Sequence, residues 1–396
     1  MRAHFRLKIT GAGLLISKLN KMENFKTAKI THQIVTESDG AQYYDMIVFC
    51  HLRWDFVYQR PQHLISRMAK DLKILLVEEP VAKNENGDAA NFTAINKNLH
   101  ILQPMVDSIE AIGAIIPKYV KNKNVPTGWF YSAAFSPLLQ SINFDTVIYD
   151  CMDELSLFKG APQHLIDQEK FLLANADIVF TGGKSLYESK KQLHHNVYCF
   201  PSSVDEEHFS KTLLDEDVPN DMRRIDSPIV GYFGVIDERI DYALIRETAA
   251  LLPKVNFVMI GPFAKVEIDD LPRAQNIHYL GMKNYSELPG YLRGFDIAMM
   301  PFALNEATKY ISPTKTLEYM AAGKPIISTK ITDVVSDYSH CVKLISNATE
   351  FAGEIQTLLD KNYGLTLQSQ YRDILDKTSW DNTANRMKSI LKTNTK

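Results

Sequence analysis

The chain has 396 residues, of which 45% are hydrophobic and 23% charged, and its formal net charge is −3. This composition is typical of a globular protein, and the length suffices for two domains of ordinary size. The small negative charge argues against a general nucleic-acid-binding protein, which would carry a basic excess. No apolar run reaches the roughly 18–20 residues that cross a bilayer. The four cysteines include no CxxC pair, so we interpret them as small buried hydrophobic residues in a reducing compartment.

The first 42 residues differ from the rest of the chain in charge. Residues 1–30 contain seven Lys or Arg and a single acid, Glu23. We expect residues 1–42 to form a basic, disordered tail, or to include an over-extended start whose true first residue is Met22. The alternative is a basic arm that rests on the inner surface of a membrane. A second candidate membrane contact is the run AIGAIIPKYVKNKNV (111–125), for which the alternative is an ordinary amphipathic helix.

Strand-like and helix-like patterns alternate over residues 43–206. Leu64, Ile65 and Met68 recur at helical spacing in the run RPQHLISRMAK, after the first expected strand. Near-continuous apolar runs predict strands at residues 45–50, 73–80, 145–154, 176–183 and 196–205. Apolar strands separated by helices indicate a parallel sheet covered on both faces, so we predict a Rossmann-like N-terminal domain.

A polar, acid-rich stretch at residues 207–227 has no clear periodicity, and we interpret it as a linker. The alternation restarts in residues 228–377, which predicts a second Rossmann-like domain. Its expected strands lie in the runs PIVGYFGVI, VNFVMIGPF, IHYLGM, FDIAMMPF, KPIIST and CVKLIS. Residues 378–396 are expected to form a last helix, with a capping box from Thr378 to Asp381, that returns to the N-terminal domain. The predicted fold class is therefore α/β, with two doubly wound domains that face each other across a ligand-binding cleft.

The segment SPTKTLEYMAAGKPIIS (312–328) combines a helix start with a cation. Ser312 is a suitable N-cap, and Pro313 suits the first helical position, where a missing N–H costs nothing. Thr314 and Lys315 then offer backbone N–H groups at the positive end of the helix dipole, and Lys315 adds a full charge. This helix start predicts an anion site.

A carboxylate, Glu318, follows one turn deeper on the same helix face. This spacing suits a nucleotide diphosphate, whose phosphates would lie on the helix start and whose ribose hydroxyls would donate to Glu318. The alternative is an exposed Lys–Glu pair worth roughly 0.2–0.5 kcal/mol. A P-loop is excluded, because Glu318 and Pro325 occupy the positions of its first glycine and of its Ser or Thr.

Together with other stretches, this segment resembles the two-domain GT-B glycosyltransferases, in particular the retaining family 4 group of bacterial surface-polysaccharide synthesis. The other stretches are HLRWDFVYQRPQHL (51–64), YDCMDE (149–154), FPSSVDEEHF (200–209), GYFGVIDERID (231–241) and LGMKNYSELPGYLRGFDIAMMPF (280–302). The resemblance spans about residues 45–395. It implies that a sugar passes from a nucleotide-diphosphate sugar to a glycan or lipid-linked acceptor with retention of configuration. It also implies no metal or cofactor, and a cytoplasmic setting that extends to the inner face of the membrane.

The resemblance assigns further donor contacts to the second domain. Gly234 ends a strand, where a glycine lets the backbone approach a phosphate, and Arg239 is given the role of a diphosphate cation. Asn305, Thr308 and Lys309 should face the same cleft, with Lys309 as a second cation. The alternative is a solvated loop.

One stretch of the first domain is assigned to the chemistry. Asp153 follows a buried strand and is the candidate catalytic residue, facing the acceptor hydroxyl or the reacting sugar. Asp150 is expected to orient the loop by hydrogen bonds. A metal site on these two carboxylates is the alternative, but the sequence shows no further ligands for it.

The first strand–helix loop is assigned to the acceptor. Arginine suits a phosphate or carboxylate, and tryptophan can stack on a sugar face. The four candidate residues are His51, Arg53, Trp54 and Arg60. The alternative is that Trp54 lies in the core and that Arg60 pairs with Glu78 or Glu79.

The chain departs from the family pattern near the donor sugar. The family carries two glutamates eight positions apart, but the residue eight positions before Glu318 is Tyr310, and the nearest acid is Glu306. Because the missing glutamate commonly contacts the donor sugar, the choice of sugar is where this chain should differ. Two rival interpretations remain: a nucleotide-sugar epimerase, which shares the donor site but lacks an acceptor site, and a non-catalytic nucleotide-sugar-binding protein.

Overall fold

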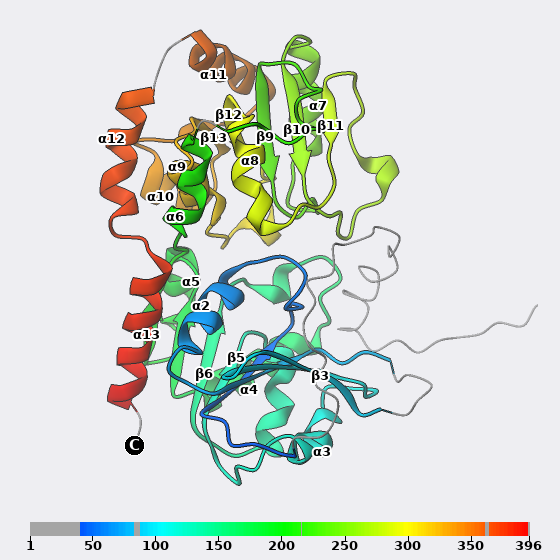
Figure 1. Ribbon diagram of the computed structural model, residues 1–396, viewed down its shortest axis with the longest axis vertical. Coiled ribbons are helices and arrows are strands. Elements are labelled where there is room, and N and C mark those ends of the chain that lie inside the picture. The colour runs from blue at the N-terminus through cyan, green and yellow to red at the C-terminus, as the bar shows by residue number, and fades with distance from the viewer. Residues whose placement is uncertain (1–39, 83–87, 215, 361–363, 395–396) are drawn as a thin grey trace, which may run out of the picture. The chain divides into compact units, whose positions relative to one another are not determined.

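The computed structural model describes residues 40–82, 88–214, 216–360 and 364–394. Almost all of the predicted basic tail, residues 1–39, lies outside the described residues. The chain divides into two compact units, which Figure 1 draws as ribbons. The first unit comprises the chain up to Thr181, then Ser189–Tyr198 and Met387–Lys396, and the second comprises Gly182–Glu188 and Cys199–Arg386.

The first unit is built on an eight-stranded sheet with the order β3-β4-β2-β1-β5-β6-β7-β8. Its strands are β1 (Met46–Cys50), β2 (Ile74–Glu78), β3 (Ala90–Asn96), β4 (Leu99–Pro104), β5 (Val125–Phe130), β6 (Phe144–Cys151), β7 (Ile178–Thr181) and β8 (Val197–Cys199). Neighbouring strands from β4 to β7 pair in parallel, whereas β3 pairs with β4 antiparallel at the edge. Its helices include α2 (Arg60–Met68), α3 (Ile112–Ile115), α4 (His164–Asn175) and α5 (Lys184–Lys190), the last of which begins in the second unit.

The second unit contains a six-stranded, wholly parallel sheet with the order β11-β10-β9-β12-β13-β14. Its strands are β9 (Ile229–Phe233), β10 (Asn256–Ile260), β11 (Ile277–Tyr279), β12 (Ile297–Met300), β13 (Ile326–Thr329) and β14 (Lys343–Ile345). Its helices are α6 (Glu206–Phe209), α7 (Tyr242–Leu251), α8 (Leu288–Arg293), α9 (Lys315–Ala321), α10 (Thr332–Tyr338), α11 (Ala348–Asp360), α12 (Gly364–Leu375) and α13 (Trp380–Asn394). The prediction of an α/β fold with two parallel-sheet domains is confirmed.

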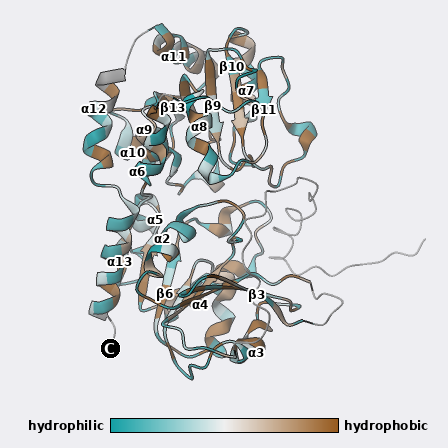
Figure 2. Cartoon of the chain, in the orientation of Figure 1, coloured by the Kyte–Doolittle hydropathy of each residue, from teal (hydrophilic) through white to brown (hydrophobic). Residues whose placement is uncertain are grey.

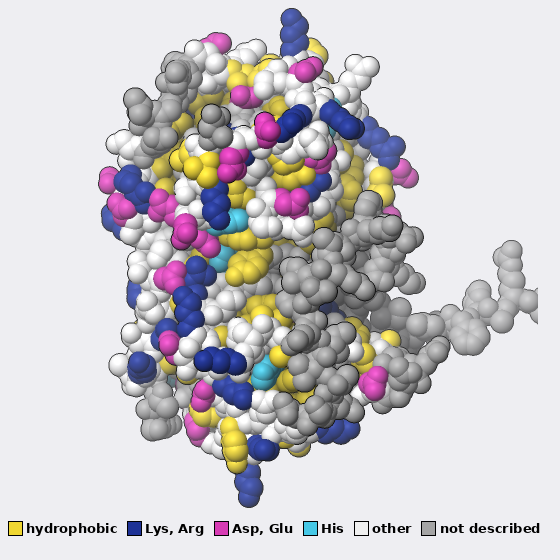
Figure 3. All heavy atoms as spheres, in the orientation of Figure 1, with side chains coloured by type: hydrophobic (Ala, Val, Ile, Leu, Met, Phe, Trp, Pro, Cys, Tyr) yellow, Lys and Arg dark blue, Asp and Glu magenta, His cyan; other side chains and the backbone are white. Residues whose placement is uncertain are grey.

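Burial explains why these strands are continuous apolar runs. Every residue of β1, β2 and β9 is buried, because helices cover both faces of a parallel sheet. Figure 2 shows the hydrophobic colour concentrated on the strands of the two sheets. On the face drawn in Figure 3, acidic and basic side chains lie interspersed, and neither sign dominates.

The stretch 207–227, predicted to be a linker, is instead part of the second unit. Phe209 and Met222 are buried in its core. The guanidinium of Arg293 on α8 donates hydrogen bonds to the carbonyls of Lys211 and Leu214. The boundary of the second unit therefore lies before Cys199. Phe209 and Met222, with the half-buried Val218 and Ile225, are few apolar anchors in a mostly polar stretch, so its place in the core does not stand out in the sequence.

Three strands of the first unit, β3, β4 and β5, were not predicted. Strand β3 is an edge strand that is mostly half-exposed, so it shows no apolar run. Strand β5 contains Pro126 and Gly128, which are unusual in strands, but Gly128 is required because a Cβ there would lie 2.8 Å from the Phe144 ring. The candidate membrane contact at 111–125 contains the short α3 and a turn of 3-10 helix at Ile116–Lys118, and Ile112, Ile115 and Ile116 are buried within the unit.

The C-terminal helix α13 begins in the second unit, and from Met387 onward the chain groups with the first unit. Lys388 pairs there with Asp71 at 2.6 Å. The helix is capped by Ser379, whose hydroxyl accepts the N–H of Asn382 at 3.1 Å. The expected cap at Thr378 is wrong, because that hydroxyl donates to the carbonyl of Ile374.

Candidate functional site

The helix start of the predicted anion site lies later in the sequence than expected. Helix α9 begins at Lys315, with Thr314 at the N-cap position and Pro313 before the helix. Ser312 does not act as the N-cap; its carbonyl accepts a hydrogen bond from Ser202 at 3.1 Å. The segment is thus held to the chain that precedes α6 by its backbone, and Lys315 is its first helical residue.

Lys315 lies directly against the end of strand β9. Its ammonium nitrogen is 5.7 Å from the centroid of the Phe233 ring, which places a cation over an aromatic face. Gly234 follows with φ +143°, and a Cβ at this position would lie 2.2 Å from Lys315 Cε. The glycine is therefore needed both for the backbone conformation and for the approach of Lys315. The structure brings these two predicted donor residues together.

Glu318 is buried one turn further along α9. Only 8% of the residue is exposed, and its Oε2 has no hydrogen-bond partner among the described residues. Burial raises the pKa of this carboxyl to about 6, and the charge of Lys315 opposes the shift. The alternative of an exposed Lys–Glu pair is wrong. A buried acceptor without a donor is costly, which suits an oxygen that accepts from a ligand hydroxyl.

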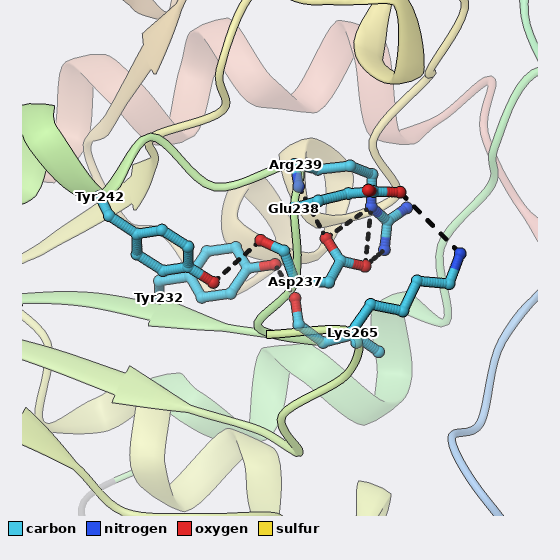
Figure 4. A network of polar contacts seen from close by, with 7 residues as sticks. Tyr232, Asp237, Glu238, Arg239, Tyr242 and Lys265 are labelled. Atoms are coloured by element: carbon cyan, nitrogen blue, oxygen red, sulfur yellow. Dashed lines mark hydrogen bonds and ion pairs between the residues drawn. The ribbon is translucent and has the colours of Figure 1, made fainter. Parts of the chain in front are cut away.

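Arg239 is held by its own loop. Its guanidinium makes a bidentate ion pair with Asp237, the shortest contact being 2.7 Å, as Figure 4 shows. The carbonyl of Asp237 accepts the Tyr242 hydroxyl at 2.9 Å, which fixes the loop to the start of α7. Asp237 was not singled out in the sequence, although its position two residues before Arg239 makes the pairing possible.

The three predicted donor residues after β12, Asn305, Thr308 and Lys309, make different contacts. Thr308 is buried, and its backbone N–H donates to the side chain of Asn305 at 3.2 Å, so both side chains stabilise a short turn. Lys309 is exposed, 3.8 Å from Glu306. These residues and Lys330–Thr332 line a hollow of about 270 Å³ in the second unit.

Arg60 and Asp150 form a buried ion pair in the first unit. The Nη2–Oδ1 distance is 2.9 Å, and the side chains are 6% and 0% exposed. Arg60 therefore pairs with the end of β6, as expected for an orienting Asp150. An arginine held in this way positions the loops around it.

The loop that contains His51, Arg53 and Trp54 is fastened to the end of β2. Glu78 accepts from the Arg53 guanidinium at 3.0 Å and from the backbone N–H of Trp54 at 2.7 Å. His51 and Trp54 are only partly buried, so Trp54 is not a core residue. Burial raises the pKa of the neighbouring Glu79 to about 7, and the charge of Arg53 opposes the shift. Glu78 and Glu79, the acids at the end of β2, could have suggested this contact from the sequence, but they were considered only as partners of Arg60.

Asp153 lies in the loop after β6, next to a buried charged cluster that sequence reasoning missed. Lys190, 1% exposed, pairs with Glu154 at 2.7 Å and with Glu169 at 2.8 Å. The hydroxyl of Tyr149 donates to Glu169 at 2.7 Å. We call Glu154, Glu169 and Lys190 the Lys190 cluster. It fixes the residue that follows Asp153 and therefore the loop itself.

Two further observations concern the described part of the chain as a whole. No three His, Cys, Asp or Glu side chains gather there in an arrangement that could hold a metal ion. Likewise, none of the described helices has the length and apolar character of a membrane span.

Comparison with known proteins identifies relatives of this architecture. Residues 227–361 match the family model described as "Glycosyl transferases group 1". TuaH of Bacillus subtilis, described as a glycosyltransferase of teichuronic acid biosynthesis, is 25% identical over 304 residues, which are 71% of this chain and 74% of TuaH. Sucrose-phosphate synthase from Thermosynechococcus elongatus superposes with a TM-score of 0.66 at 14% identity, over 88% of this chain and 98% of the synthase.

Anabaena HepE, solved in complex with UDP-glucose, also has a TM-score of 0.66, at 12% identity, over 89% of this chain and all of HepE. At these identities the solved structures show the fold alone. The family match covers the part of the second unit that contains Gly234, Lys315 and Glu318. The match of residues 227–361, the likeness to TuaH and the shared fold together show that the chain is a glycosyltransferase with the GT-B fold.

Proposed function

We propose that the protein transfers a sugar from a nucleotide-diphosphate sugar to a glycan or lipid-linked acceptor of a cell-surface polysaccharide. The observation that carries this proposal is Glu318, a buried carboxylate with an open oxygen, one turn from Lys315, which itself lies against Gly234. HepE, solved with UDP-glucose, and TuaH, described for teichuronic acid synthesis, support the donor class and the kind of product.

In this proposal the second unit binds the donor. Lys315, Arg239 and Lys309 neutralise the diphosphate, and backbone N–H groups near Gly234 and at Ser312–Lys315 complete its surroundings. Glu318 accepts hydrogen bonds from the ribose hydroxyls. Glu306 is the acid nearest to the position of the family's missing glutamate, so the contacts to the sugar differ from the family's. The residues that select the sugar are expected around Asn305 and Lys309.

The first unit supplies the acceptor side in this proposal. The bond between the anomeric carbon and the diphosphate oxygen breaks, a bond to the acceptor oxygen forms, and the proton of the acceptor hydroxyl passes to an oxygen of the departing nucleotide diphosphate. Asp153 faces this hydroxyl or the reacting sugar, and Arg53, Trp54 and His51 contact the acceptor. Arg60 contributes by holding Asp150. We propose that the configuration at the anomeric carbon is retained, and that the leaving charge is stabilised without a metal.

We further propose that the reaction takes place in the cytoplasm, at the inner face of the membrane when the acceptor is lipid-linked. Co-sedimentation with anionic vesicles is the corresponding measurement. Binding that depends on residues 1–39 would support the basic arm, and equal binding without them would contradict it.

The decisive experiment is nucleotide release with and without acceptor. A thermal-shift series with UDP-, GDP- and ADP-sugars first identifies the donor, because a ligand of the native state raises the unfolding temperature. Release of the free nucleotide diphosphate only when an acceptor glycan is added supports transfer. Interconversion of the donor sugar alone would favour an epimerase, and binding without turnover in either case a binding protein.

A further inference from the structure

A half-buried lysine in the second unit, Lys265, has no role in the site described so far. It lies in the loop after β10, and its side chain is 22% exposed. Its ammonium nitrogen is 3.9 Å from Glu238 Oε1, which is an ion pair but too long for a hydrogen bond. Burial lowers the pKa of the Lys265 ammonium, and the charge of Glu238 opposes the shift. This ammonium is thus partly desolvated and paired with that carboxylate.

The backbone of Lys265 is strained. Its φ is +55°, and it is the one non-glycine residue with a positive φ among those the structure describes. This conformation costs a lysine roughly 1–2 kcal/mol, and glycine or asparagine would adopt it more easily. The side chain of Lys265 therefore contributes something that a better-suited turn residue would not.

The loop of Lys265 is packed against the predicted diphosphate site. A Cβ on Gly261, four residues earlier, would lie 1.8 Å from the carbonyl oxygen of Gly234. The N–H of Ala264 donates to the carbonyl of Ile236 at 3.0 Å. Gly234 in turn contacts Lys315. The loops after β9 and β10, two neighbouring parallel strands, are thus pressed together at the carboxyl edge of the sheet.

Figure 4 shows that the cationic ends of Lys265 and Arg239 point to the same side, with the Glu238 carboxylate next to both. Arg239 is matched by Asp237 at 2.7 Å, a contact that includes true hydrogen bonds. Lys265 is paired with Glu238 at 3.9 Å. An anion that binds Arg239 on this side would therefore also meet the Lys265 ammonium.

We propose that Lys265 binds the phosphates of a nucleoside diphosphate, as a third cation next to Arg239 and Lys315. The proposal rests on the function proposed above and adds a residue to its donor site. The ligand chemistry is a diphosphate attached to a nucleoside, because the loop of Lys265 is joined through Gly234 to Lys315 and Glu318.

The test is calorimetric titration of the wild type and of Lys265→Asn. Asparagine tolerates the left-handed backbone, so this change removes the charge and relaxes the strain together. UDP, GDP and ADP are titrated first, and the tightest of them is compared with its own nucleoside. We expect Lys265→Asn to bind the diphosphate roughly tenfold more weakly and the nucleoside equally well. Its unfolding temperature should be unchanged or higher.

Two further variants keep the result interpretable. Lys254→Asn removes an exposed lysine of the same unit and should change neither binding nor stability. Lys265→Gly repeats the loss of charge on an unstrained backbone, in case asparagine disturbs the loop. Undiminished diphosphate binding by both Lys265 variants would overturn the proposal, and so would an equal loss of affinity for the nucleoside or a lower unfolding temperature. A wild type that binds none of the three diphosphates would instead overturn the proposed function itself.

Discussion

Glu318 carries two properties that conflict unless a ligand is bound. It is buried, which favours its neutral form, and it lies one turn from Lys315, which favours the charged form. A residue placed for stability alone would have a partner for Oε2 or would be apolar. The open oxygen of Glu318 is therefore the strongest indication of ligand binding in the described part of the chain.

Glu318→Gln should weaken nucleotide diphosphate binding roughly tenfold to a hundredfold, because hydrogen bonds to a charged acceptor are worth about 1.5–3 kcal/mol. Calorimetric titration measures this loss. The matched control is Glu247→Gln, which changes an exposed glutamate of the same unit and should bind as the wild type does. Unchanged affinity in Glu318→Gln would show that the assignment of this segment is wrong.

The same carboxyl predicts a pH dependence of stability. Its pKa rises from 4.5 in the unfolded chain to about 6 in the fold, so the folded state binds the proton more tightly. The stabilisation from this group is complete below pH 4.5 and is lost as the pH rises through 6, by about 2 kcal/mol. In Glu318→Gln this loss of stability with rising pH should be absent from the pH profile of chemical denaturation. A profile identical to that of the wild type would contradict the buried titration.

Asp153 can be separated from the donor residues by measuring two quantities. Asp153→Asn should lower acceptor-dependent turnover by about 10²–10⁴-fold, the usual contribution of a positioned acid or base. Its affinity for the nucleotide diphosphate should equal that of the wild type, since the donor residues belong to the other unit. A variant that keeps its turnover would remove Asp153 from the chemistry.

At the scale of elements, the junction of β9 and α9 depends on a glycine. Gly234→Ala should destabilise the second unit by roughly 1–3 kcal/mol and weaken nucleotide binding, because its Cβ would collide with Lys315 at a positive φ. Gly353→Ala is the control: nothing lies near that position in the middle of α11, so the change should stabilise by about 0.5–1 kcal/mol. Urea denaturation measures both variants, and the same sign for both would contradict the structure.

The Lys190 cluster also predicts an effect on stability and turnover. Lys190→Met leaves the half-buried Glu154 and Glu169 next to each other without a cation, which should cost roughly 3 kcal/mol of unfolding free energy and lower turnover through the Asp153 loop. Lys190→Arg should recover part of both losses. Lys170→Met, on the exposed face of α4, should change stability by less than about 0.5 kcal/mol. Full stability of Lys190→Met in urea denaturation would contradict the cluster.

At the scale of the whole molecule, the proposed chemistry needs no metal. Addition of EDTA should therefore leave the rate of acceptor-dependent nucleotide release unchanged, because Lys315, Arg239 and the other cations of the second unit balance the leaving diphosphate. Activity that is lost with EDTA and restored by Mg²⁺ would contradict this expectation.

The sequence predicted the second unit better than the first for a physical reason. The four inner strands of its parallel sheet, β9, β10, β12 and β13, are short and almost fully buried, since both faces are covered. Strands β3 and β5 gave no apolar run, because one is a half-exposed edge and the other contains Pro126 and Gly128. The stretch 207–227 was misassigned because its few apolar anchors, chiefly Phe209 and Met222, stand in a mostly polar sequence.

The site was predictable where its residues are close in sequence. The spacing of Lys315 and Glu318 gave their shared helix face, but the burial of Glu318 depends on the whole unit. The pairing of Arg60 with Asp150 joins residues 90 positions apart, and no local pattern contains that information. Lys265 carries no sequence signal at all, because its strain exists only in the folded loop.

The division of α13 has a consequence for synthesis. Residues 387–396 group with the first unit, yet they leave the ribosome after the whole second unit. The ion pair between Lys388 and Asp71 can therefore form only after the second unit has been synthesised. Domains usually fold in order as they emerge. Here the first unit lacks the segment that starts at Met387 until the second unit has been made, so a nascent chain stalled before Met387 should present an unfinished first unit to chaperones and proteases.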